Sequence, residues 1–145
     1  MFRVGDIVFF PEYTFTDTGE TMPHYGLVML PQNWGQWSTQ IYCCVITSKL
    51  PKSRLHIICK SQKYSCFNVD SYICFNRFDL QPFNGSRDQK KAELDLLDIK
   101  KGLNLLHKCI HNRVVGYSDK FLRAALIREW KSRRSELGKA GSANN

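Results

Sequence analysis

The stretch that decides the fold is Pro23-His24-Tyr25-Gly26-Leu27-Val28-Met29-Leu30, which lies between Gly5-Asp6-Ile7-Val8 and Cys44-Val45-Ile46-Thr47-Ser48-Lys49. These segments are rich in the branched and aromatic residues that favour strands. Turn-forming residues separate them at 17–20 and 31–35. The sequence therefore predicts consecutive strands at 6–10, 24–30 and 41–47.

Further strands are predicted at 55–60, 64–68 and 71–75, again between turn residues. Strands this short, without a helical period, are typical of a small closed barrel. From residue 91 the pattern changes to the three- and four-residue spacing of an amphipathic helix, in Leu96, Ile99, Leu103, Leu106 and Ile110. A second helix is predicted after Ser118, a suitable N-cap. The expected fold class is α+β, mostly β, with C-terminal helices packed on a small barrel.

The chain is expected to form one compact unit in three parts. Residues 1–112 would be the barrel with its packing helix, and residues 113–137 a basic helical extension. The tail at 138–145 is rich in Gly, Ala, Ser and Asn, so we expect it to be disordered.

The formal net charge of +8 favours an acidic partner such as a nucleic acid. Most of the excess is C-terminal: residues 1–86 hold seven Lys and Arg against six Asp and Glu, whereas residues 87–145 hold fourteen against seven. A second, local basic stretch lies between Glu20 and Asp70, where no acidic residue occurs; its members are Lys49, Lys52, Arg54, Lys60 and Lys63.

Six cysteines lie among apolar, strand-forming residues: Cys43, Cys44, Cys59, Cys66, Cys74 and Cys109. No CxxC pair is present, and no signal peptide precedes them, so we expect reduced thiols in the core of a cytoplasmic protein without a metal or other cofactor. No apolar run approaches the roughly 20 residues that cross a bilayer. No membrane partner is therefore expected.

Residues with the chemistry for RNA cleavage stand at the ends of two predicted strands. His24 begins one strand and Thr47-Ser48-Lys49 ends the next, so adjacent antiparallel strands would bring them to the same rim. Metal-free cleavage needs a base for the 2′-hydroxyl and groups that stabilise the charged phosphorane. Imidazole, hydroxyl and ammonium groups meet these needs. The alternative is structural, because strand-end hydroxyls also satisfy backbone groups.

In their order and spacing, the Gly-Asp-Ile, Pro-His-Tyr-Gly-Leu-Val and Ile-Thr-Ser segments resemble the MazF/PemK/Kid toxin endoribonucleases, over about residues 2–110. The resemblance implies an SH3-like barrel, a homodimer and a cognate antitoxin. It also implies cleavage of single-stranded RNA to 2′,3′-cyclic phosphate and 5′-hydroxyl ends. His24 corresponds to the family's active-site arginine, and Thr47, followed by Ser48, to its threonine or serine.

The Thr47–Lys52 run is also similar to the ToxN-type ribonucleases, which adds weight to Ser48, Lys49 and Lys52. The predicted catalytic residues are thus His24, Thr47 and Ser48. The predicted RNA-binding residues are Lys49, Lys52, Arg54, Arg77, Trp34 and Trp37. Arg77 has an alternative role in a salt bridge with Asp79 or Asp70. The tryptophans could equally cover the barrel end or form a dimer contact.

Other functions fit the same pattern, because fold does not determine function. The replacement of the family arginine by His24 is consistent with an inactive barrel that binds nucleic acid or protein. An SH3-like domain that binds only a protein partner is a further possibility. The basic helix of 113–137 has four alternative roles: a solvated face, an RNA-backbone clamp, a dock for an acidic antitoxin segment or a membrane-surface helix.

Overall fold

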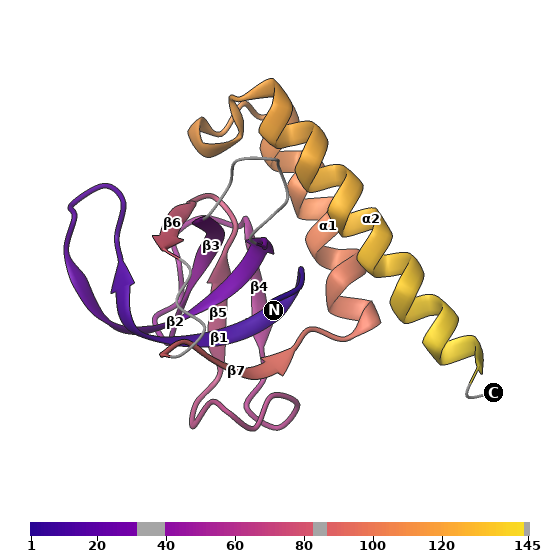
Figure 1. Ribbon diagram of the computed structural model, residues 1–145, viewed down its shortest axis with the longest axis horizontal. Coiled ribbons are helices and arrows are strands. Elements are labelled where there is room, and N and C mark those ends of the chain that lie inside the picture. Colours follow the sequence, from indigo (N-terminus) through magenta and orange to yellow (C-terminus); the bar gives the residue numbers. More distant parts are fainter. Residues whose placement is uncertain (32–39, 83–86, 144–145) are drawn as a thin grey trace.

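The computed structural model describes residues 1–31, 40–82 and 87–143. Within these residues the strands and helices are, in chain order, β1 (Asp6–Thr14), β2 (Thr21–Leu30), β3 (Gln40–Thr47), β4 (His56–Cys59), β5 (Ser71–Cys74), β6 (Asp79–Pro82), β7 (Gln89–Glu93), α1 (Leu96–His111), the 3-10 turn η1 (Val115–Tyr117) and α2 (Lys120–Ala143). Strand-rich and helical parts thus follow one another along the chain (Figure 1).

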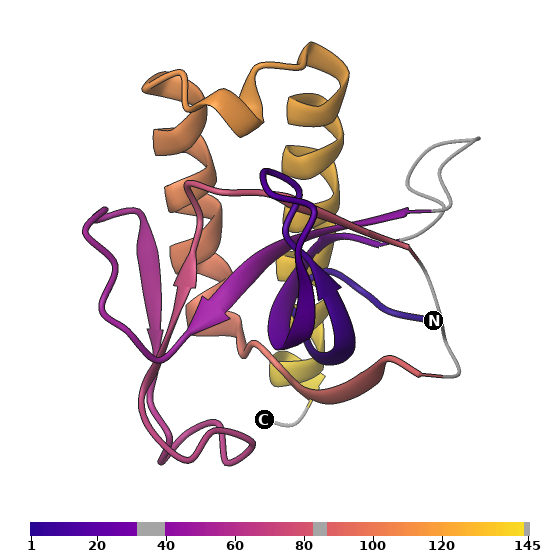
Figure 2. The ribbon, with the colours of Figure 1, turned by 90° about the vertical axis from the view of Figure 1, so that its left-hand side faces the viewer.

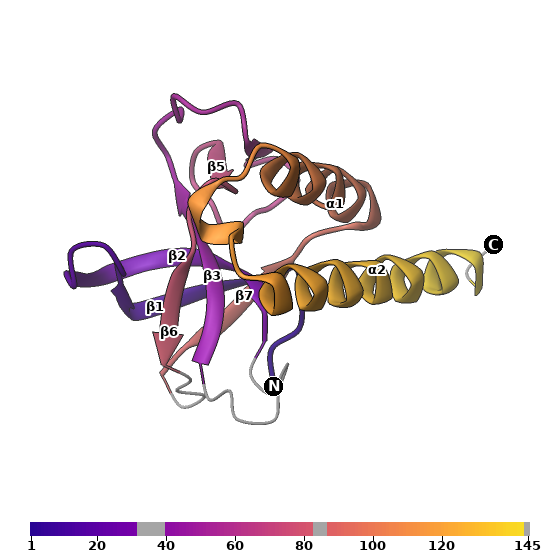
Figure 3. The same cartoon turned by 90° about the horizontal axis from the view of Figure 1, so that it is seen from above.

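The described strands form one antiparallel sheet in the order β4-β5-β3-β2-β1-β7, with β6 also paired to β3. One edge of β3 pairs with β2, while its other edge is divided between two strands. Gln40–Cys43 pairs with β6, and Ile46 and Thr47 pair with β5. The two helices run side by side (Figure 2) and lie together on one side of the sheet (Figure 3).

Alternate residues of the central strands contribute to two separate hydrophobic cores. On the helix side, Ile7, Leu27 and Cys44 belong to a core with Leu103 and Trp130. The second core is built from Phe2 and strand residues: Val8, Phe10, Tyr13, Val28, Ile41, Cys43 and Val45. Because residues of β1, β2 and β3 bury this second face against one another, the sheet is strongly curved.

Side chains join β6 to β1 across this curve. The Gln81 amide accepts the Thr14 N–H and donates to the Thr14 carbonyl, both at 2.8 Å, as a neighbouring strand would. The Asp79 carboxylate, 1% exposed, accepts the Tyr13 hydroxyl at 2.6 Å and the Thr16 N–H at 2.9 Å. Burial and this carboxylate raise the pKa of Tyr13, so the phenol remains a donor.

The helices are capped by aspartates and packed through one tryptophan. Asp95 accepts the Asp98 N–H at 3.0 Å at the start of α1, and Asp119 accepts the Leu122 N–H at 2.8 Å at the start of α2. Trp130 is completely buried and donates its indole N–H to the Met29 carbonyl at 3.1 Å. The second helix is therefore anchored directly to the sheet.

Most of the predicted elements are confirmed, with shifted ends. The strands predicted at 6–10, 24–30, 41–47, 55–60 and 71–75 correspond to β1 to β5, and both helices are present. The strand predicted at 64–68 is wrong, because that segment forms turns. Asp119 rather than Ser118 caps α2, and this helix continues to Ala143 instead of ending at Leu137.

No helix in the described ranges is long and apolar enough to span a membrane.

The contact between Gly102 and Trp130 gives a stability prediction. A Cβ added at Gly102 would lie 2.5 Å from a Trp130 ring carbon and 3.2 Å from the Phe75 ring. Gly102→Ala should therefore lower the free energy of unfolding by about 1–3 kcal/mol through overpacking, although alanine is the better helix former. At Gly138 an added Cβ has no neighbour within 4 Å apart from adjacent residues and the backbone of its own helix, so Gly138→Ala should raise the free energy of unfolding by up to about 1 kcal/mol. Urea denaturation measures both, and equal effects would contradict this packing.

Glu93 gives a prediction on acid stability. The hydrogen bond from Lys90, at 3.0 Å, lowers the pKa of Glu93, and Arg133 at 3.2 Å and Arg3 at 3.6 Å add to the effect. A carboxyl with a lowered pKa in the folded state stabilises the protein above its unfolded pKa of about 4.3, and the stabilisation disappears as the pH falls through the folded pKa.

Glu93→Gln should therefore be less stable than the wild type at pH 7, and the difference should shrink as the pH falls below about 4.3. Urea denaturation at a series of pH values measures this. A difference that stays constant with pH would show that the charge of Glu93 does not contribute.

Candidate functional site

Two hollows meet at His24 and Thr47, which line both of them. We call them the Phe67 hollow and the Arg77 hollow, each of about 390 Å³. The first is also lined by Phe9, Tyr25, Ser48, Phe67, Asn68 and Ser71, and the second by Phe15, Lys52, Ser53, Cys74, Asn76 and Arg77. His24 and Thr47 belong to the lining of both hollows, and we refer to the two hollows together as the depression.

Strand register brings these two residues together. Tyr25 in β2 pairs with Ile46 in β3, so the next positions along the antiparallel strands are His24 and Thr47. Thr47 also pairs with Tyr72 in β5. The expectation that His24 and Thr47 lie at the same rim is therefore confirmed.

His24 is held in a defined orientation. Its half-buried ring packs edge-on against Phe15, with centroids 5.7 Å apart, and lies 5.8 Å from the ring of Tyr13. Its Nδ1 lies 3.1 Å from the Tyr25 carbonyl oxygen. Because a carbonyl only accepts hydrogen bonds, Nδ1 carries the proton and the lone pair of the neutral ring is on Nε2. This tautomer suits a base that acts through Nε2.

Arg77 brings a positive charge to the same depression. Its guanidinium lies over the Phe15 ring, 5.2 Å from the centroid. The guanidinium also donates a hydrogen bond to the Asp17 carboxylate at 2.7 Å. Its Nε is 3.9 Å from the Asp79 carboxylate. The salt bridge expected with Asp79 is present, although Asp17 is the nearer partner, and Asp70 instead pairs with Lys60. Phe15 thus lies between Arg77 and the His24 ring.

The strand-end hydroxyls also lie in this depression. The Thr47 Oγ accepts the Lys49 N–H at 3.2 Å, which leaves its own proton for another acceptor. Ser48 is exposed and lines the Phe67 hollow, while Lys52 lines the Arg77 hollow.

The other predicted RNA-binding residues are placed differently. Lys49 and Arg54 are exposed, but neither belongs to the lining of the two hollows. Trp34 and Trp37 lie outside the described residues. The site as described therefore rests on His24, Thr47, Ser48, Lys52 and Arg77.

Two cysteine thiols at the depression remain protonated. Burial raises the pKa of Cys66 in the Phe67 hollow. It also raises the pKa of Cys74 in the Arg77 hollow, although Arg77 opposes the effect. Because only the thiolate is a strong nucleophile, this environment does not favour cysteine chemistry.

Sequence reasoning missed the aromatic residues that hold the site. Phe15 follows the irregular end of β1, where the register with β2 shifts between Phe10 and Tyr13. Phe67 lies in the turn segment that the sequence predicts as a strand. The only sequence signal for Phe15 is the aromatic density of 9–15, which does not indicate where the rings point.

No three His, Cys, Asp or Glu side chains of the described residues lie close enough together to hold a metal ion.

Comparison with known proteins adds no relative: no protein-family model matches the sequence, and no curated protein matches it. The interpretation of the site therefore rests on its geometry and on the sequence pattern.

Proposed function

We propose that this protein is the toxin of a toxin–antitoxin system and acts as a metal-independent endoribonuclease on single-stranded RNA. The observation that best supports this is the position of His24 and Thr47 at the junction of the two hollows, with Arg77 and Lys52 in one of them. The depression thus combines a base, hydroxyl donors and cations, which are the groups that attack by a 2′-hydroxyl requires.

The proposed fold is an SH3-like barrel of the MazF/PemK type. Among the described residues, β6 and β1 are not paired through their backbones. The hydrogen bonds of Gln81 to Thr14 and of Asp79 to Tyr13 connect these two strands and support closure of the barrel between them. Closure of this kind would fix the loop that carries Phe15 and, through it, the orientation of His24.

In the proposed reaction, His24 acts first. Its Nε2 takes the proton of the 2′-hydroxyl, and the 2′-oxygen then attacks the adjacent phosphorus. The bond from phosphorus to the 5′-oxygen breaks, and this oxygen leaves with a proton taken from water. The products are a 2′,3′-cyclic phosphate and a 5′-hydroxyl, with His24 protonated until it returns its proton to solvent.

The remaining groups hold the phosphate during this step. The Arg77 guanidinium and the Lys52 ammonium stabilise the negative charge that develops on the non-bridging oxygens. Thr47 and Ser48 donate hydrogen bonds to the same oxygens. The bond of Arg77 to Asp17 orients the guanidinium, and because Asp17 is exposed, the arginine is able to turn toward RNA.

The Phe67 hollow favours a single-stranded substrate. The rings of Phe9 and Tyr25, with centroids 5.3 Å apart, line it beside Phe67. Aromatic rings stack on bases that are not paired in a duplex. RNA would therefore lie across the depression with a base in this hollow and its phosphate near His24.

The partners follow from the family resemblance. The protein would be a cytoplasmic homodimer, inhibited by a cognate antitoxin whose acidic, flexible segment fills the RNA-binding depression. The net charge of +8 supports both an RNA substrate and an acidic inhibitor.

Comparison of RNA with DNA tests the function. Purified protein in EDTA is incubated with a mixed-sequence single-stranded RNA and with the DNA of the same sequence. We expect the RNA to be cut at discrete positions and the DNA to stay intact, because DNA lacks the attacking hydroxyl. Intact RNA that still binds the protein would instead indicate an inactive binding module. Binding that disappears at modest salt would indicate charge attraction alone.

A further inference from the structure

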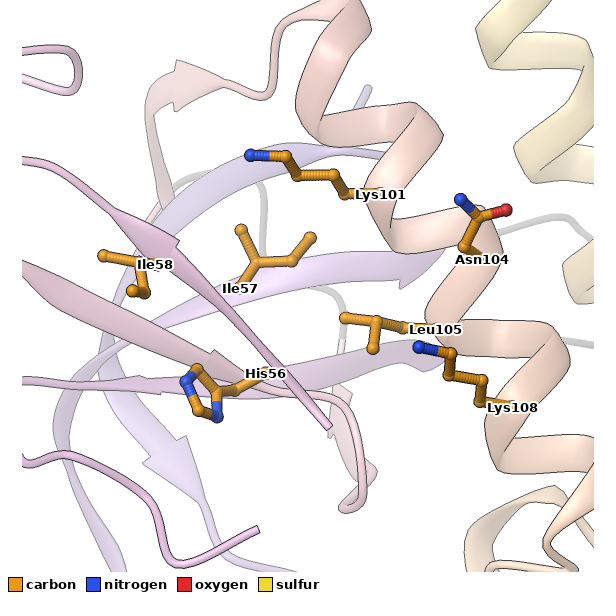
Figure 4. Close-up of a pocket in the computed structure, with 7 residues that line it drawn as sticks. All are labelled: His56, Ile57, Ile58, Lys101, Asn104, Leu105 and Lys108. Carbon is orange, nitrogen blue, oxygen red and sulfur yellow. The ribbon is translucent and has the colours of Figure 1, made fainter. Parts of the chain in front are cut away.

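A groove separates the outer strand β4 from α1. Its volume is about 380 Å³, and it is lined by His56, Ile57, Ile58, Lys101, Asn104, Leu105 and Lys108. None of these residues lines either of the hollows at His24. Figure 4 shows Lys101, Leu105 and Lys108 extending from α1 toward the strand. The groove is thus distinct from the proposed ribonuclease site.

One wall of the groove is the end of the sheet. Among the described residues, β4 pairs with β5 alone and is the last strand in the sheet order. Such an edge strand carries backbone groups that can pair with another extended chain. The side chain of Ile58, 43% exposed, adds apolar surface at this edge. These features favour the addition of a further strand.

The other wall is a single stripe of α1. The positions 101, 104, 105 and 108 are three and four residues apart and therefore share one helix face. No carboxylate of the described residues lies within 4 Å of the Lys108 ammonium, and Lys101 reaches only Asp98, at 4.0 Å. Leu105 is half-buried between the two lysines. The stripe presents two largely uncompensated positive charges on either side of an apolar side chain.

We propose that this groove binds an acidic peptide in extended conformation, which adds to β4 as a further strand. Two acidic side chains four residues apart would face Lys101 and Lys108, and an apolar side chain midway between them would face Leu105. Lys101 and Lys108 are seven residues apart on the helix, which corresponds to about 10.5 Å along its axis. Two acidic residues four positions apart in a strand are separated by about 13 Å. The flexible lysine side chains are long enough to cover the difference.

The apolar and backbone features select a peptide over a nucleic acid. RNA could neutralise the lysines, but it has no backbone amides to pair with β4. The RNA backbone also has no apolar side chains to bury against Ile57, Ile58 and Leu105. A peptide satisfies the strand edge, the apolar surface and the charges together.

A designed peptide tests this proposal. The probe is a labelled seven-residue peptide in which threonines alternate with glutamate, valine and glutamate, so that the two glutamates are four residues apart. We expect it to shift the backbone amide NMR signals of His56–Cys59 and to slow hydrogen exchange in this strand. The double variant Lys101→Glu/Lys108→Glu should bind the peptide about tenfold more weakly or worse.

Matched controls separate strand addition from charge attraction. Lys100→Glu changes an exposed lysine of α1 that does not line the groove, and it should bind like the wild type. A peptide with proline in place of the valine lacks the central N–H and should bind poorly. His24→Ala should not affect peptide binding, so failure here and failure of the proposed ribonuclease activity are distinguishable.

Three results would overturn the proposal. The first is the absence of shifts in β4 at millimolar peptide. The second is equal binding of the proline peptide, or an equal loss in Lys100→Glu, because either would indicate non-specific charge attraction. The third is an oligouridylate that shifts the same β4 signals at lower concentration than the peptide, which would make the groove a nucleic-acid surface.

Discussion

His24→Ala is expected to lower the rate of RNA cleavage by about 10²–10⁴-fold while the affinity for RNA is retained. The side chain is held by its Nδ1 bond to Tyr25 and by the ring of Phe15, so its Nε2 is oriented for proton transfer. Alanine removes the base, but Arg77, Lys52 and the Phe67 hollow remain to bind RNA. Single-turnover cleavage and binding to an uncleavable 2′-O-methyl RNA measure the two quantities separately.

His107→Ala is the matched control, because this exposed histidine of α1 lies outside both hollows. Its activity should equal that of the wild type. Unchanged cleavage by His24→Ala would show that the base is another group. An equal loss in both variants would indicate a general effect on the protein rather than a role for His24.

Trp130→Ala is expected to lower the free energy of unfolding by about 3–5 kcal/mol. The ring is completely buried, contacts Gly102 and Phe75, and donates its N–H to the Met29 carbonyl. Its removal leaves a large cavity between α2, α1 and the sheet, and it also leaves a buried carbonyl without this donor. Urea denaturation monitored by far-UV circular dichroism gives the value.

Phe121→Ala is the matched control on the same helix, because Phe121 is 79% exposed. It should change the free energy of unfolding by no more than about 0.5 kcal/mol. Trp130→Phe should fall between the two alanine variants, since it keeps part of the ring but loses the hydrogen bond. Equal stability of Trp130→Ala and Phe121→Ala would contradict the position of α2 in the core.

Because α2 packs into the core, a role of its basic residues in RNA binding cannot be tested by deleting the helix. Leu122, Ala125, Leu126 and Trp130 belong to the helix-side core, so removal of 118–145 would expose that core. Loss of RNA binding after such a deletion would not identify a clamp. Substitution of exposed residues such as Arg128 and Lys131 tests the charge of this helix without disturbing the core.

The strands of the central sheet were predictable because their residues alternate between two apolar cores. The same criterion wrongly predicts a strand at 64–68, because the aromatic residues Tyr64 and Phe67 of this turn segment are also buried. Tyr64 is held there by long-range bonds, with its hydroxyl donating to Asp98 and accepting the Asp95 N–H. A local pattern does not distinguish this arrangement from a strand.

The strands β6 and β7 were not predictable from local pattern. In β6, the polar side chains of Asp79 and Gln81 are buried because Tyr13, Thr14 and Thr16, distant in sequence, satisfy them. In β7, Lys90 and Lys91 are exposed and give no strand signal. Tertiary hydrogen bonds and pairing with β3 decide β6, and pairing with β1 decides β7.

The candidate site was predictable only in part. The strand pattern and register place His24 beside Thr47, and the family resemblance directs attention to both. The contact of Arg77 with Phe15 depends on how the loop after β1 folds back over β6. Such a contact between residues far apart in the chain leaves no periodic signal in the sequence.

Analysis of the fragment ends from RNA cut in EDTA tests the central claim most directly, because the end groups report which oxygen attacked phosphorus. We expect a 2′,3′-cyclic phosphate on one side of each cut and a 5′-hydroxyl on the other, and no fragments with His24→Ala. Intact RNA from the folded wild type, or ends bearing a 3′-hydroxyl and a 5′-phosphate, would contradict attack by the 2′-hydroxyl at this site.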